Sequence, residues 1–162
     1  MKLTFAERFR SLFQEPYAVT KQIGIVEGQR VADIGAGLGY FTISAATLVG
    51  RTGLVYSIEP DPTRSDRIRS RVAAERLGDL PSGSVDLAFS AFSIHHFNDR
   101  QASLAEIRRI LREGGSFYVW DRVPGMIIRH GTRLEELNLL SPGFTGFELL
   151  GAGRMVRARF TK

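Results

Sequence analysis

The chain has 162 residues, of which 43% are hydrophobic and 24% charged, values ordinary for one globular domain. It contains no cysteine, which excludes a disulfide framework, a cysteine-ligated metal or iron–sulfur cluster, and a cysteine nucleophile. The formal net charge is +5, and the 22 basic residues, mostly arginine, are interspersed with 17 acidic ones. This distribution indicates a solvated, arginine-rich surface, and it leaves an anionic partner open.

No apolar run reaches the roughly 18 residues of a membrane span, and charges interrupt the apolar pattern at the N-terminus. We therefore expect a soluble, cytoplasmic protein with no membrane association. Short apolar runs alternate with amphipathic stretches, as is typical of an α/β domain. We expect a single domain over residues 1–162, made of N-terminal helices (1–27), a core (28–121), and a C-terminal helix and hairpin (122–162).

Helices are predicted where apolar residues recur at a spacing of three or four after a capping residue. Capping-box patterns, a threonine followed three residues later by glutamate, begin at Thr4 and at Thr132. Asp61 precedes a proline at a helix start, and Asn98 or Asp99 caps another helix. The predicted helices cover residues 4–14, 17–23, 40–49, 62–70, 99–112 and a short segment between Thr132 and Pro142.

Seven strands are predicted from short apolar runs bounded by turn residues. The run at 85–90 (VDLAFS) is the clearest and the run at 71–77 the weakest. The last two strands are expected to form an antiparallel hairpin joined at 151–153. The strands cover residues 30–34, 54–58, 71–77, 85–90, 116–120, 144–150 and 155–160.

A glycine-rich turn, Asp33-Ile-Gly35-Ala36-Gly37-Leu-Gly39-Tyr40, follows the first strand and opens a helix. Glycines allow the backbone to approach a ligand, and the helix N-terminus offers free N–H groups, so this is a nucleotide-type turn. The third glycine comes one residue earlier than in the dinucleotide fingerprint G-x-G-x-x-G. Glu59 follows Gly39 by 20 residues, at the end of the second strand, where a carboxylate can accept both ribose hydroxyls. The alternative is a tight turn without a ligand.

The segment from Asp33 to Gly39 resembles motif I of the class I S-adenosylmethionine-dependent methyltransferases, and Glu59 resembles their second-strand acid. Three further segments resemble this family in the same order: LPSGSVDLAFS (80–90), SIHHF (93–97) and EIRRILREGG (106–115). The nearest subgroup is the small-molecule branch called type 11, which includes ubiquinone and menaquinone biosynthesis methyltransferases. The resemblance implies a Rossmann-like α/β fold. Its seven-stranded, mostly parallel sheet has the order 3-2-1-4-5-7-6, with a C-terminal antiparallel hairpin and helices on both faces.

The resemblance also implies S-adenosyl-L-methionine as the cofactor. The glycines would let the backbone approach its methionine part, Asp33 would act near its ammonium, and Glu59 would hold its ribose. The implied cofactor-binding residues are Asp33, Gly35, Ala36, Gly37, Gly39, Tyr40, Glu59, Pro60, Ala74, Glu75, Ser90 and Ala91. The family's adenine-contacting aspartate after the third strand is lost if Ala74-Glu75 takes its place. Asp79 keeps an acid but shortens the spacing to the fourth strand, so a helix between these strands is expected to be missing.

Methyl transfer from a sulfonium is an in-line displacement that needs alignment and, for some acceptors, removal of a proton. The candidates for a catalytic base are His95, His96, His130 and Asp121, with packing or solvated loop positions as the alternatives. A cluster that could hold a carboxylate or phosphate comprises Arg122, Arg129, His130 and Arg133. No metal is expected, because zinc-type His and Cys spacing is absent.

We expect methyl transfer to a small-molecule acceptor, with an anionic acceptor as one option and S-adenosylhomocysteine as the product. An RNA or protein methyltransferase is the alternative, motivated by a pI of about 10.1. The signature Asn/Asp-Pro-Pro-aromatic of amino-directed nucleic-acid enzymes is absent, so nucleic acid is not favoured. A non-catalytic protein with the same fold is a further alternative, because the third-strand region is compressed. A homodimer that completes the acceptor site is also left open.

Overall fold

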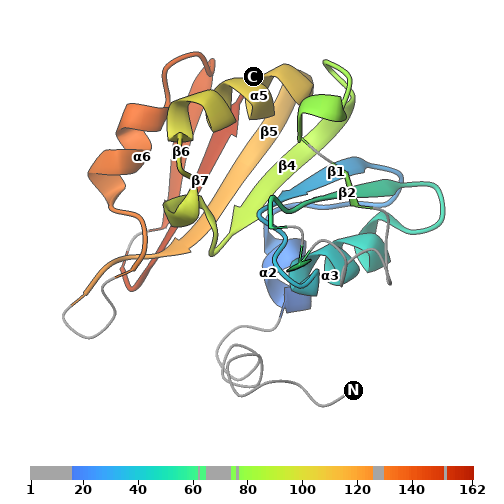
Figure 1. The fold of residues 1–162 in the computed structure, drawn as a ribbon, viewed down its shortest axis with the longest axis horizontal. Helices are drawn as coiled ribbons and strands as arrows, with labels where there is room; N and C mark the ends of the chain where they lie inside the picture. The colour runs from blue at the N-terminus through green and yellow to red at the C-terminus, as the bar shows by residue number, and fades with distance from the viewer. Residues whose placement is uncertain (1–15, 62, 65–73, 76, 126–129, 152) are drawn as a thin grey trace.

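The computed structural model describes residues 16–61, 63–64, 74–75, 77–125, 130–151 and 153–162. The predicted helix over 4–14 and most of the helix over 62–70 lie outside these residues. A seven-stranded sheet runs through the described part in the order β3-β2-β1-β4-β5-β7-β6 (Figure 1). The predicted fold class, strand number and strand order are therefore confirmed.

The first five strands are parallel, and the last two form an antiparallel hairpin through which β7 pairs with β5. The central strand β1 is buried at four of its five positions because helices cover both faces of the sheet there. The strands are β1 (Arg30–Ile34), β2 (Leu54–Ile58), β3 (Ala74–Glu75), β4 (Val85–Ala91), β5 (Leu111–Arg122), β6 (Gly146–Gly151) and β7 (Met155–Thr161).

Four α-helices of the described part cover the sheet, two on each face (Figure 1). Helices α2 (Pro16–Gln22) and α3 (Tyr40–Val49) share one apolar cluster with Val31 and Phe89. Helices α5 (Arg100–Ile110) and α6 (Leu134–Leu140) share the other with Phe117. Side chains alternate between the two faces of the sheet along β5. Those of residues 117, 119 and 121 point toward α5 and α6, and those of residues 118 and 120 point toward α2.

The predicted boundary between α5 and the fifth strand is wrong. The helix ends at Ile110, and β5 begins at Leu111 rather than at residue 116. Leu111 pairs with Val85, but the next pair joins Leu87 to Ser116, so residues 112–115 bulge out of the ladder. Leu111 continues the apolar spacing of the helix, so the sequence did not show that the chain becomes a strand at this residue.

The third strand and the last helix also differ from prediction. Strand β3 has two residues in the described part, and a single 3-10 turn, η1 (Leu77–Asp79), precedes β4. The described residues between these strands therefore contain no α-helix, as predicted. The capping box predicted at Thr132 is wrong: α6 has Arg133 as its N-cap and no side-chain cap hydrogen bond. The Thr132 hydroxyl instead donates to Asp121.

Candidate active site

The glycine turn connects β1 to α3 at the edge of the sheet where the parallel strands end. Gly35, Gly37 and Gly39 have φ angles of 77°, 61° and 77°, in the left-handed region that favours glycine. A Cβ at Gly35 would lie 2.5 Å from Oγ of Ser93, whereas a Cβ at Gly37 would meet no atom within 4 Å. The turn therefore packs against the protein at Gly35 and leaves open space at Gly37.

Glu59 lies directly after β2 and faces the same turn. One carboxylate oxygen accepts the N–H of Gly37 at 2.7 Å, and the other accepts the N–H of Asp61 at 3.0 Å. The group is half-buried, so part of it stays within reach of a ligand. The predicted ribose acid thus stands beside the open space at Gly37.

Asp33 is the second acid of this site, and it is only 2% exposed. Burial raises the pKa of Asp33 to about 7, the charge of Glu59 adds to this rise, and a 2.7 Å hydrogen bond from the Thr42 hydroxyl partly offsets it. A cationic ligand group nearby would favour the ionised form of this buried carboxyl. Thr42 was not predicted as a site residue; a threonine inside an apolar helix was its only signal.

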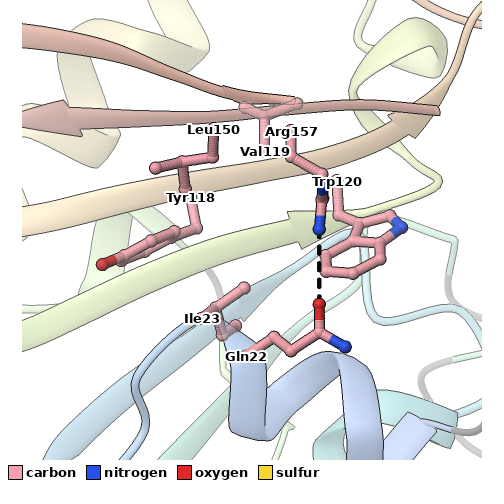
Figure 2. A pocket seen from close by; sticks show the side chains of 7 residues that line it. All are labelled: Gln22, Ile23, Tyr118, Val119, Trp120, Leu150 and Arg157. Atoms are coloured by element: carbon pink, nitrogen blue, oxygen red, sulfur yellow. Dashed lines mark hydrogen bonds between the residues drawn. The ribbon is translucent and has the colours of Figure 1, made fainter. Parts of the chain in front are cut away.

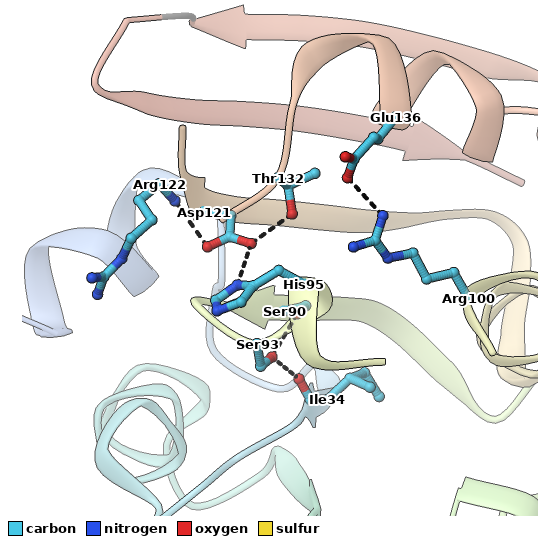
Figure 3. Close-up of polar contacts among 9 residues, drawn as sticks. All are labelled: Ile34, Ser90, Ser93, His95, Arg100, Asp121, Arg122, Thr132 and Glu136. Atoms are coloured by element: carbon cyan, nitrogen blue, oxygen red, sulfur yellow. Dashed lines mark hydrogen bonds and ion pairs between the residues drawn. The ribbon is translucent and has the colours of Figure 1, made fainter. Parts of the chain in front are cut away.

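The end of β4 is fixed to the end of β1 through two serines (Figure 3). The Ser93 hydroxyl donates to the Ile34 carbonyl at 2.7 Å, and its oxygen lies 2.7 Å from Oγ of Ser90. Phe92, between them, has a φ of 58°, which is rare for a residue with a side chain and typical of functional turns. The predicted residues Ser90 and Ala91 are buried here, and their contact with a cofactor stays a prediction.

Two of the predicted catalytic candidates, His95 and Asp121, are in direct contact (Figure 3). Nδ1 of His95 lies 2.8 Å from Oδ2 of Asp121, which is fully buried. The same carboxylate accepts the Thr132 hydroxyl at 2.7 Å and the Arg122 N–H at 2.8 Å. Because a carboxylate accepts, Nδ1 donates and Nε2 carries the lone pair of the neutral imidazole. Sequence reasoning found both residues but not their pairing.

The other two candidate bases lie outside this pair. The ring of His96 lies 4.0 Å from the ring of His95, centre to centre. Partial desolvation and the neighbouring His95 lower the pKa of His96. His130 is exposed. No hydrogen bond or ion pair among the described residues joins His130, Arg122 and Arg133, and Arg129 lies outside them, so the predicted anion cluster stays a prediction.

The remaining predicted cofactor residues surround the glycine turn. Ala74 and Glu75 pair with the last two residues of β2, which places their backbone beside Glu59. Pro60 is exposed, Ala36 is buried, and Tyr40 begins α3 with its ring 5.9 Å from that of Phe41. The contacts of these residues with a cofactor stay predictions.

Within the part of the chain that the structure describes, no group of three His, Asp or Glu side chains could hold a metal ion. The same part contains no helix that is both long enough and apolar enough to cross a membrane.

This fold and this turn define the class I S-adenosylmethionine-dependent methyltransferases. The family model described as "Methyltransferase domain", type 11, matches residues 32–119, more than half of the chain. The protein therefore belongs to the type 11 methyltransferase family, as the sequence motifs predicted.

Three similarities illustrate this membership. An O-methyltransferase of Aspergillus nomiae is 30% identical over 118 residues, which cover 64% of this chain and 52% of the relative. The ubiquinone/menaquinone biosynthesis C-methyltransferase UbiE of Psychromonas ingrahamii is 29% identical over 110 residues, 59% of this chain and 43% of the relative. The chain thus spans about half the length of these relatives. The crystal structure of an S-adenosylmethionine-dependent methyltransferase from Aquifex aeolicus shares the fold with a TM-score of 0.78 at 21% identity, covering 94% and 91% of the two chains.

The residues present fit S-adenosylmethionine. Open space beside Gly37 leaves room for the methionine part of the cofactor to approach the backbone of the turn. The carboxylate of Glu59 suits the two neighbouring ribose hydroxyls. The buried carboxyl of Asp33 has a raised pKa, and the cationic methionine end would shift it toward its negatively charged form. The Gly37 N–H donates to Glu59, and the charge of Glu59 acts on Asp33, so these three residues lie near one another after β1 and β2.

Proposed function

We propose that the protein transfers a methyl group from S-adenosylmethionine to a hydroxyl of a small-molecule acceptor and releases S-adenosylhomocysteine. The observation that carries this proposal is the contact between His95 and buried Asp121 beside the end of β4. A hydroxyl is a weak nucleophile until it loses its proton, so an acceptor of this kind benefits from a positioned base. The two curated relatives, named as an O-methyltransferase and a quinone-biosynthesis C-methyltransferase, support a small-molecule acceptor.

When bound, the cofactor would supply a methyl group on a sulfonium: an in-line nucleophile bonds to the methyl carbon as the carbon–sulfur bond breaks and S-adenosylhomocysteine leaves. Glu59 and the glycine turn would hold it by ribose and backbone contacts, and Asp33, ionised beside its cationic end, would supply the matching charge. Nε2 of His95 removes the acceptor's proton as the new oxygen–carbon bond forms. Asp121 is a positioning residue: it keeps the proton on Nδ1 and stabilises the imidazolium that results. The proton then leaves His95 to solvent.

A nucleic-acid acceptor is less well supported. Many arginines of the described part are engaged by acids, including those in the pairs Arg64–Asp61, Arg100–Glu136, Arg109–Glu106, Arg112–Asp86 and Arg159–Glu148. Such pairing disperses the positive charge instead of gathering it along one face. The non-catalytic alternative rests on the short sequence spacing between the predicted third strand and Leu80-Pro81, where the family's adenine-contacting aspartate is expected.

Calorimetry with S-adenosylmethionine and S-adenosylhomocysteine, with NAD as a control ligand, tests the cofactor half of the proposal. We expect micromolar binding that Glu59→Ala weakens at least tenfold, because the ribose loses its acceptor. Glu113→Ala changes an exposed acid far from the turn and should bind normally. Absence of binding to the wild type would favour the non-catalytic alternative.

Product formation tests the acceptor half. S-Adenosylhomocysteine release is followed with a panel of hydroxylated small molecules and, in parallel, with RNA oligonucleotides and a protein extract. Turnover of a small hydroxylated compound that His95→Gln abolishes supports the proposal. Turnover restricted to RNA or protein contradicts it. Binding to RNA that weakens steeply with salt would point to the same alternative.

A further inference from the structure

A hollow of about 170 Å³ lies on the α2 side of the sheet, between α2 and the strands β5 and β7 (Figure 2). We call it the Trp120–Arg157 pocket. Its lining includes Gln22, Ile23, Tyr118, Trp120, Leu150 and Arg157. A cavity of roughly 150 Å³ lined by Leu, Ile and Phe holds one benzene molecule. The pocket therefore has room for a single ring, and Tyr118, Ile23 and Leu150 give that ring apolar walls.

The charged group of this pocket is Arg157. Its guanidinium carbon lies 5.3 Å from the centre of the Trp120 ring, and Trp120 and Arg157 are directly opposed across β5 and β7. Its side-chain hydrogen bond within the described residues is long, 3.4 Å, and goes to the neutral amide oxygen of Gln22 (Figure 2). Among the described residues no acid pairs with Arg157, and Glu148 on the same hairpin is engaged by Arg159.

The backbone makes room for this guanidinium. A Cβ at Gly151 would lie 2.5 Å from Nη2 and 2.9 Å from Nε of Arg157. Gly151 also follows an irregularity in the pairing of β6 with β7, next to Leu149. The position of Arg157 therefore depends on a glycine in the facing strand, and the partly buried cation there lacks an anionic partner in the described part. Such a group favours a carboxylate, to which it can donate two parallel hydrogen bonds.

The pocket adjoins the candidate active site. Trp120 pairs with Ala91, the last residue of β4, and its carbonyl accepts the Phe92 N–H at 2.8 Å. The next residue of β5 is Asp121, which holds His95 on the opposite face of the sheet. The indole Nε1 of Trp120 is buried and has no hydrogen-bond partner among the described residues. A ligand seated against Trp120 therefore lies near the end of β5, on the face of the sheet opposite to His95 and Asp121.

We propose that the Trp120–Arg157 pocket binds a carboxylate carried on a single apolar ring. This binding is a property of the pocket itself and goes beyond the proposed methyl transfer, because His95 and Asp121 lie on the opposite face of the sheet. Arg157 pairs with the carboxylate, and the ring packs against Trp120, Tyr118 and Ile23.

The chain's single tryptophan is Trp120, so its fluorescence reports on this pocket alone. Full-length protein is titrated with benzoate and with benzamide, a neutral molecule of nearly the same shape, and the affinities are checked by calorimetry. We expect saturable binding of benzoate that changes Trp120 emission, and at least tenfold weaker binding of benzamide. Arg157→Gln should weaken benzoate binding at least tenfold, whereas Arg157→Lys, which keeps the charge, should lose less.

The matched control is Arg51→Gln, which removes an exposed arginine from the turn before β2 and should bind benzoate normally. Affinity for S-adenosylmethionine, measured on each variant, reports whether the fold is intact. Equal binding of benzoate and benzamide, or equal binding by wild type and Arg157→Gln, overturns the proposal. Cofactor binding without benzoate binding overturns this inference alone. Arg157-dependent benzoate binding without cofactor binding supports the pocket and overturns the proposed function.

Discussion

Nδ1 of His95 lies 2.8 Å from Oδ2 of Asp121, although the two residues are 26 positions apart in the chain. His95 belongs to the 3-10 turn η2 (Ile94–His96) that follows β4, and Asp121 is near the end of β5. The pairing of Ala91 with Trp120 brings these two segments side by side. Two further hydrogen bonds hold the buried carboxylate, from Thr132 and from the Arg122 backbone, so Asp121 can orient the imidazole.

Asp121→Asn should lower kcat on the order of a hundredfold, while the Kd for S-adenosylmethionine stays unchanged. An amide can donate to Nδ1, which would move the imidazole proton to Nε2 and remove the base. The measurement is S-adenosylhomocysteine formation at saturating cofactor, with calorimetry for the cofactor Kd. His95→Gln should give a similar loss, since the two residues act as one unit.

The neighbouring His96→Gln is the matched control for this experiment, and its kcat should stay within about threefold of the wild-type value. Thr132→Val removes one hydrogen bond to Asp121 and should cost less activity than Asp121→Asn. Full activity in His95→Gln, or a loss in His96→Gln equal to that in His95→Gln, would remove His95 as the base.

Two glycines of the same turn should respond differently to alanine. Gly35→Ala should lower the free energy of unfolding by about 2–4 kcal/mol, because a left-handed alanine is strained and its Cβ would overlap the Ser93 side chain. Gly37→Ala should cost only about 1 kcal/mol of stability, since no atom lies near the new Cβ. Its cofactor affinity should nevertheless fall at least tenfold, because the methyl group occupies the space left for the ligand.

Urea denaturation and calorimetry separate these two effects. Gly78→Ala is the control, as its Cβ also meets open space and its φ is not in the left-handed region. Its stability should change by less than about 0.5 kcal/mol. Normal cofactor binding by Gly37→Ala would show that the ligand does not use the space over this residue.

The sequence predicted elements well where the signal is local. Strands β1 and β2 and helix α3 have the predicted bounds, because apolar runs flanked by glycine and a turn determine them within a few residues. Glu59 could be placed by counting from the glycines, since a parallel strand–helix–strand unit fixes which edge both occupy. The strand order came from the family resemblance.

Prediction from the sequence failed where contacts with residues distant in the chain determine the structure. Thr132 satisfies the capping-box pattern, yet it is fully buried, and its hydroxyl donates to the charged Asp121 carboxylate instead of accepting a helix-start N–H. Leu111 continues the helical spacing of Ile107 but pairs with Val85 in the sheet. The contact between His95 and Asp121 depends on the register of β4 with β5, which no local pattern encodes.

The N-cap of α5 offers a direct stability test of a choice that the sequence left open between Asn98 and Asp99. The Asp99 carboxylate accepts the Ala102 N–H at 2.9 Å, so Asp99 is the cap. Asp99→Ala should lower the free energy of unfolding by about 1 kcal/mol, because one helix-start N–H loses its partner. Asn98→Ala changes the exposed neighbour and should be close to neutral in the same denaturation experiment. Equal losses in both variants would contradict the assignment.

Asp33 should make stability depend on pH. Its pKa is raised from 3.8 to about 7 by burial, so the folded protein keeps a proton that the unfolded chain releases. The stabilisation by this carboxyl is fully present below pH 3.8 and is lost as the pH rises through about 7, a change on the order of 4 kcal/mol.

Asp33→Asn cannot ionise, so the difference in unfolding free energy between variant and wild type should shift in the variant's favour between pH 4 and pH 8. Asp79→Asn, at an exposed acid, should show a constant difference over the same range. Parallel pH curves for Asp33→Asn and wild type would show that Asp33 is ionised in the folded protein, and a pre-formed negative charge would then face the cofactor.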